Sequence, residues 1–163
     1  MTPVKFRVYA HLAPTQDDLD QVLKSSISGT LFLQVDDVFF PARGWGDYVV
    51  PVLYWWIDNA MRIYLPDSEV KNICMDGPYT FYMRRSVGSD EVLLTLREDA
   101  RSVTGQYTIS YKRCLATFRG AAKTVLNELR ELGVEEQGET SNLRSSLVQL
   151  ERLESEIKAR GLP

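Results

Sequence analysis

Four short segments between residues 70 and 111 alternate apolar and polar side chains, and only a few residues separate each segment from the next. A period of two residues is that of a strand with one face buried. Short connections join neighbouring strands only in antiparallel order, because a parallel pair needs a long crossover. The turn-forming sequence Asp76-Gly77-Pro78 between the first two segments is typical of such a connection. An antiparallel meander is therefore predicted, with strands over residues 70–75, 79–85, 91–97 and 103–111.

Two long helices are predicted on either side of this meander. Residues 48–65 are apolar over far more than one helical stripe, so this helix should lie at the centre of the fold. Asp58 and Arg62 interrupt the segment, which marks it as a buried helix and not a membrane span. Residues 115–132 repeat apolar side chains at steps of three and four, the pattern of an amphipathic helix.

A last helix is predicted over residues 142–160, with a narrow seam of leucines between charged flanks. An isolated helix of this length is marginal in water, so the seam must dock on a neighbour. We expect it to fold back along the 115–132 helix, because short connections between helices usually join antiparallel neighbours. A helix that reaches across to a second subunit is the alternative.

The N-terminal part adds further strands and a short helix. Residues 4–8 alternate apolar and basic side chains, and residues 30–35 and 38–40 are rich in strand-forming types. Thr15 and the acids that follow it favour a helix that ends near residue 25.

Together these elements predict an α+β fold, a largely antiparallel sheet packed against two long helices, with an additional C-terminal helix. We divide the chain into a single α+β domain, residues 1–139, and a C-terminal helical appendage, residues 140–163, docked on the same domain.

The composition is that of an ordinary globular domain. The chain has 163 residues, of which 44% are hydrophobic and 25% are charged, and a domain of this size needs no disulfide or metal to hold its core. The formal net charge of -3 argues against a general nucleic-acid-coating role, which needs a basic face. The first residues do not read as a signal peptide. We therefore expect a cytoplasmic protein without a nucleic-acid or membrane partner, and a monomer is favoured.

Two cysteines and a single histidine offer little catalytic material. Cys74 and Cys114 both lie near apolar residues, which predicts buried, reduced thiols. A cysteine nucleophile needs an exposed, electropositive setting and a base within reach, so a dyad of either thiol with His11 is a poor candidate. These three residues lack the spacing of a zinc site, and we expect no metal and no cofactor.

Acidic side chains supply a further catalytic candidate. Asp36, Asp37 and Asp76 could form a carboxylate cluster with Asp47 for acid–base chemistry or metal-dependent hydrolysis. Each of them also has a structural explanation at a turn or at the start of a helix. Asp47 in particular is placed to cap the helix of residues 48–65.

Aromatic side chains on the predicted meander indicate a possible interaction surface. Tyrosine, tryptophan and arginine are the usual anchors of a protein interface, although ordinary packing within the sheet is the alternative for the tyrosines. The candidate partner-binding residues are Asp36, Asp37, Arg43, Asp76, Tyr79 and Tyr82.

Three segments in the middle third of the chain resemble a group of small bacterial proteins. They are the pattern F-P-x-x-x-W-x-D-[YF] at residues 40–48, the double tryptophan Trp55-Trp56, and the turn D-G-P-Y at residues 76–79. Some members of this group look like immunity proteins encoded beside polymorphic or contact-dependent toxins. The resemblance implies a cytoplasmic, non-enzymatic protein that binds and neutralises a cognate toxin.

Two other functions stay open at this point. One is a small hydrolase-type enzyme that uses Asp36, Asp37 or Asp76, and the other is a structural protein that oligomerises through its C-terminal helix. Several carboxylates converging in a pocket would favour the enzyme. An acidic surface with exposed aromatic side chains would favour the inhibitor.

Overall fold

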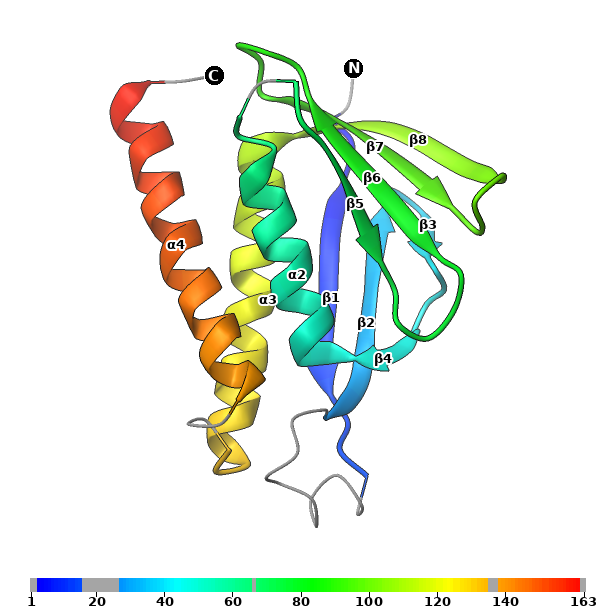
Figure 1. Ribbon diagram of the computed structural model, residues 1–163, viewed down its shortest axis with the longest axis vertical. Coiled ribbons are helices and arrows are strands. Elements are labelled where there is room, and N and C mark those ends of the chain that lie inside the picture. Colours follow the sequence, from blue (N-terminus) through cyan, green and yellow to red (C-terminus); the bar gives the residue numbers. More distant parts are fainter. Residues whose placement is uncertain (1–2, 16–26, 66, 135–137, 162–163) are drawn as a thin grey trace.

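A layer of helices packs beside two antiparallel sheets in the computed structural model, which describes residues 3–15, 27–65, 67–134 and 138–161 (Figure 1). The described residues form two four-stranded sheets and three helices. The strands are β1 Phe6–Leu12, β2 Ser28–Val35, β3 Val38–Phe40, β4 Gly46–Tyr48, β5 Glu69–Ile73, β6 Thr80–Arg85, β7 Glu91–Arg97 and β8 Val103–Ser110. The helices are α2 Val49–Arg62, α3 Tyr111–Glu131 and α4 Glu139–Arg160.

The first sheet is built around β2, whose second half is buried on both faces. Strand β1 pairs with one side of β2, from Phe6 opposite Val35 to Leu12 opposite Gly29. Strands β3 and β4 pair with different parts of the other side of β2. Strand β1 is therefore an edge strand of this sheet.

The second sheet is the meander β5-β6-β7-β8, with every neighbouring pair antiparallel. The strand pattern of residues 70–111 predicted this part of the fold. Side chains on alternate positions, such as Phe81, Met83 and Leu94, are fully buried. Their neighbours along the strands face outward, as the two-residue period requires.

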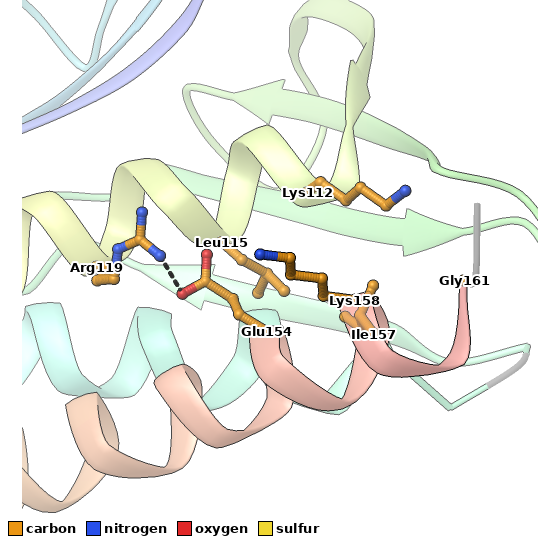
Figure 2. A pocket seen from close by; sticks show the side chains of 7 residues that line it. All are labelled: Lys112, Leu115, Arg119, Glu154, Ile157, Lys158 and Gly161. Carbon is orange, nitrogen blue, oxygen red and sulfur yellow. Dashed lines mark hydrogen bonds and ion pairs between the residues drawn. The ribbon is translucent and has the colours of Figure 1, made fainter.

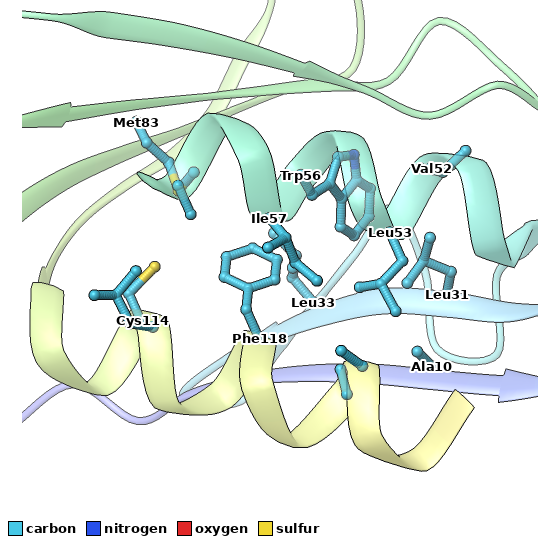
Figure 3. Close-up of a cluster of buried hydrophobic side chains, with 14 of the residues drawn as sticks. Ala10, Leu31, Leu33, Val52, Leu53, Trp56, Ile57, Met83, Cys114 and Phe118 are labelled. Atoms are coloured by element: carbon cyan, nitrogen blue, oxygen red, sulfur yellow. The ribbon is translucent and has the colours of Figure 1, made fainter. Parts of the chain in front are cut away.

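Helix α2 contacts strands of both sheets, β2 of the first and β5 of the second. Figure 3 shows Leu53 and Ile57 of α2 gathered with Leu31 of β2 and Phe118 of α3. On its side toward the second sheet, Trp56 meets the ring of Phe81 edge to face, with ring centroids 4.9 Å apart. A helix that is apolar beyond one stripe can pack against several neighbouring elements at once, which explains the central position of α2.

The last helix, α4, runs back along α3 and also contacts α2. Its buried apolar side chains are Leu143, Leu150 and Ile157. Polar contacts hold it to both neighbours: Ser146 donates a hydrogen bond to Asp58 of α2 at 2.6 Å, and Arg119 of α3 pairs with Glu154 at 2.7 Å. No helix within the described ranges is long and apolar enough to cross a lipid bilayer.

The expectation of one sheet packed by two long helices is wrong in its detail, because the strands form two sheets. Strand periodicity reports which side chains are buried but carries no information about which strands pair, and α2 separates the two groups of strands in the chain. Helix α3 also begins four residues earlier than predicted, at Tyr111, where the Ser110 side chain accepts a hydrogen bond from the Arg113 N–H. The helix predicted between Thr15 and residue 25 lies, beyond Thr15 itself, outside the described residues.

Candidate functional site

The six predicted partner-binding residues fall into three separate places. Asp36 and Asp37 form the turn between β2 and β3, where Asp36 has a positive φ of 51° and its carboxylate accepts the Lys5 N–H at 2.8 Å. Tyr82 lies on the outward face of β6, with the Arg97 guanidinium 5.2 Å from the centre of its ring. The other three residues, Arg43, Asp76 and Tyr79, belong to two loops that the fold brings together.

These two loops, residues 41–48 and 73–79, form what we call the junction, since it joins the first sheet to the second. The Trp45 ring meets the Tyr79 ring edge to face at a centroid distance of 4.9 Å, and Phe40 lies against the same tyrosine at 6.0 Å. Gly77 has a φ of 138°, and a Cβ there would lie 3.0 Å from the Tyr79 ring and 3.3 Å from Trp45. Glycine is therefore required for this close packing.

Asp47 is the main polar link of the junction. Its side chain is buried, and its two carboxylate oxygens accept the Tyr48 N–H at 2.8 Å and the Met75 N–H at 3.0 Å. The prediction that Asp47 caps α2 is therefore wrong: the N-cap residue is Tyr48, and no side chain bonds to the first turn there. The sequence shows the right residue type for a cap, but the carboxylate bonds instead to a loop 28 residues away.

The outer surface of the junction carries exposed side chains of the types that protein interfaces favour. Tyr48 is 42% exposed and Met75 is 47% exposed, and Arg43 and Asp76 are exposed in the same two loops, with the Arg43 guanidinium 5.3 Å from the centre of the Phe39 ring. Tyrosine, methionine and arginine are enriched in interface cores. The sequence pointed to Arg43 and Asp76 but not to Tyr48 and Met75. Both of these lie next to apolar segments, and the neighbouring residues in the sequence do not indicate that their side chains are exposed.

The candidate catalytic groups do not come together in the described structure. No hydrogen bond or ion pair among the described residues joins Asp36 or Asp37 to Asp76, and both oxygens of Asp47 are occupied by backbone N–H groups. Within the same ranges, no group of three or more His, Cys, Asp and Glu side chains is placed to hold a metal ion. His11 is exposed on β1, with its Nδ1 atom 2.9 Å from Glu128.

Both thiols lie in the protein interior, as predicted. Burial raises the pKa of Cys74 to about 12, with the nearby Asp47 charge adding to the effect. Burial also raises the pKa of Cys114, which is fully enclosed, with a smaller contribution from Asp90. Because only the thiolate is a good nucleophile, burial and the raised pKa disfavour reaction of both thiols at neutral pH.

We therefore expect slow alkylation of Cys74 and Cys114 by iodoacetamide in the folded protein and fast alkylation of both in denaturant. Mass spectrometry of the labelled protein over time measures both rates. Fast labelling of either thiol under native conditions would contradict the buried, protonated state. It would make that cysteine a candidate catalytic nucleophile again.

A cationic hollow of about 480 Å³ lies between the start of α3 and the end of α4 (Figure 2). Lys112, Arg119 and Lys158 line it, and Glu154 supplies the one carboxylate, which is paired with Arg119. The lining residues of α3 and those of α4 lie roughly 40 positions apart in the sequence, so no local spacing predicts the hollow. Its surplus of positive charge suits a small anion.

Comparison of the chain with protein-family models, with curated proteins and with solved structures gives no match.

Proposed function

We propose that this chain is a non-enzymatic protein-binding module that contacts its partner through the junction, and that the partner is a cognate bacterial toxin which it neutralises. The observation that carries the proposal is the exposure of Tyr48 and Met75 on loops that the rest of the junction holds in place.

The junction is pre-organised for binding. The Asp47 carboxylate bonds to the backbone at both exposed residues, Tyr48 and Met75, and the packed rings of Trp45 and Tyr79 lie directly between the two loops. Loops that are already ordered lose little conformational entropy when a partner binds, so more of the contact energy appears as affinity. Exposed apolar side chains on such a surface would lose contact with water in a complex.

The toxin as partner is supported by the resemblance and not by the geometry. Two of the three segments that carry the resemblance, residues 40–48 and 76–79, are the segments that meet at the junction. A net charge of -3, together with the exposed Asp76, is compatible with a cationic partner, since complementary charge speeds association.

The test uses the C-terminal domain of the large secreted protein that we expect the adjacent gene to encode. Calorimetry measures its binding to the wild-type chain, and co-expression measures protection of growing cells. The variants Tyr48→Asp and Met75→Asp should each weaken binding by about 30-fold or more, as at interface hot spots, and should reduce protection. Val148→Asp is the matched control, because Val148 has a similar exposure of 43% but lies on α4.

Three results would count against the proposal. If the adjacent gene encodes no such protein, the toxin is not the partner. If it does but the two proteins do not bind, the toxin is again excluded as the partner. Binding that both junction variants retain would overturn the junction as the contact surface. Circular dichroism of each variant must first show the wild-type fold, so that a loss of binding is not a loss of structure.

A further inference from the structure

Strand β8 is a long edge strand that the described part of the chain leaves uncovered, unlike the other edges of the two sheets. At the β5 edge, Trp56 of α2 donates its indole N–H to the Ile73 carbonyl at 2.8 Å. Asn59 of the same helix donates to the Lys71 carbonyl at 3.1 Å. In the first sheet, α3 packs along β1, and β3 and β4 have only three residues each. Natural proteins shorten or cover edge strands in these ways, because an open edge pairs with other chains.

A hydrogen bond at the end of β8 shows which of its backbone groups are open. The Tyr111 N–H donates to the Asp90 carbonyl at 2.6 Å, which continues the register of β7 and β8. The odd-numbered residues in the regular part of β8, residues 105–110, therefore direct their peptide groups toward β7. Gln106 and Thr108 direct theirs away, and β7 is the only strand paired with β8 among the described residues. Both residues are exposed, so their N–H and C=O groups are free to pair with a further strand.

The side chains of β8 do not protect this edge. The strand Val103–Ser110 contains no charged residue and no proline, which are the residue types that usually keep edge strands apart. The register shift between Leu96 and Arg97 disturbs the ladder only near the start of β8. The Tyr107 ring lies along its own strand, since a Cβ on Gly105 would be 2.7 Å from it. The ring therefore does not close the edge, and the regular part of β8 is open.

We propose that two copies of the chain form a dimer through β8, as antiparallel neighbours about a twofold axis at Tyr107. Gln106 of each copy then lies opposite Thr108 of the other, so that all their open N–H and C=O groups pair. A shifted register would bring in Thr104, at the irregular start of the strand, or Ser110, which caps α3. The two four-stranded sheets become one continuous sheet. The sequence favoured a monomer because an open edge leaves no mark in composition.

A second copy suits this edge better than a segment of another protein. Recognition of a foreign strand depends on the side chains beside the edge, and β8 offers no charge that would select one. An identical strand needs no such selection, and two uncharged strands place no like charges opposite each other. Figure 1 shows β8 at the outer edge of the second sheet, away from α4, while α3 turns back to pack along β1. The helices therefore leave room for the second copy.

This proposal does not depend on the proposed function. Strands β5 and β8 are the opposite edges of the second sheet, and the junction lies at the end of β5. Tyr48→Asp and Met75→Asp should therefore form the dimer as the wild type does. Failure of the toxin to bind would leave the dimer unaffected.

Sedimentation equilibrium of the full-length chain tests the proposal. We expect the mass of the wild type to rise with concentration from 18.6 kDa toward twice that value. The double variant Gln106→Lys/Thr108→Lys places like charges opposite each other in the dimer and should raise the dissociation constant at least about tenfold. Gln149→Lys is the matched control, because it makes the same change at an exposed glutamine of α4. Circular dichroism must show the wild-type fold for each variant.

A charge exchange tests the pairing of Gln106 with Thr108. The double variant Gln106→Glu/Thr108→Glu should also dimerise at least about tenfold more weakly than the wild type. An equimolar mixture of the lysine and glutamate double variants should form a heterodimer, because opposite charges then face each other. A misfolded variant would not recover on mixing, so this result separates loss of pairing from loss of structure.

Four results would overturn the proposal. A wild-type chain that stays monomeric at millimolar concentration would exclude a second copy as the occupant of this edge. A dimer that both double variants retain would exclude β8 as its interface, and equal weakening by Gln149→Lys would show an effect of charge alone. Double variants that fold but do not pair on mixing would exclude the antiparallel register.

Discussion

Replacing Trp56 with alanine is expected to lower the free energy of unfolding by roughly 3–5 kcal/mol. The Trp56 side chain is 1% exposed, packs edge to face on Phe81 and donates its indole N–H to the Ile73 carbonyl at 2.8 Å. Alanine would leave a cavity between α2 and the second sheet and would remove the hydrogen-bond donor that pairs with the Ile73 carbonyl. Chemical denaturation followed by circular dichroism measures the change.

Trp55 provides the matched control, because it is the neighbouring tryptophan on the same helix but is only partly buried. Trp55→Ala should cost much less than Trp56→Ala, below about 2 kcal/mol. Trp56→Phe should fall between the two, because it keeps an aromatic ring against Phe81 but leaves the Ile73 carbonyl unpaired. Equal effects of the two alanine variants would contradict the central position of Trp56.

Leu150→Ala in α4 is the second large effect that we expect, a loss of roughly 2–5 kcal/mol in the free energy of unfolding. Leu150 has no exposed surface, and its helix packs on both α2 and α3. Val148→Ala is the control, since that side chain on the same helix is 43% exposed and its loss should change stability by less than about 1 kcal/mol.

Light scattering of the Leu150→Ala protein distinguishes packing within one chain from packing between subunits. We expect a lower stability with an unchanged mass. A fall in mass from dimer to monomer would show instead that α4 holds two subunits together. An effect no larger than that of Val148→Ala would contradict the docking of α4 on the other helices.

The regular elements were largely predictable because their signals are local. The meander β5–β8 follows from side chains that alternate every two residues, and α3 follows from apolar steps of three and four. Their ends were less accurate: α3 begins at Tyr111 because Ser110 and Asp90 hold its first turn through hydrogen bonds, and no apolar repeat marks that position.

The candidate site was predictable only in part. Arg43, Asp76 and Tyr79 lie on the two loops of the junction, whereas Asp36 and Asp37 form a turn between β2 and β3 and Tyr82 lies on the face of the second sheet. Tyr48 and Met75 were missed, since their exposure depends on how two loops from different sheets meet.

The sequence by itself determined the α+β class, the meander, the three long helices and the buried thiols, because each depends on the spacing or the chemical type of side chains close together in the chain. Only the tertiary structure decided that the strands form two sheets and that Asp47 bonds to Met75. Those features depend on contacts between residues far apart in the chain. Such contacts follow from the packing of the whole fold, and no local pattern records them.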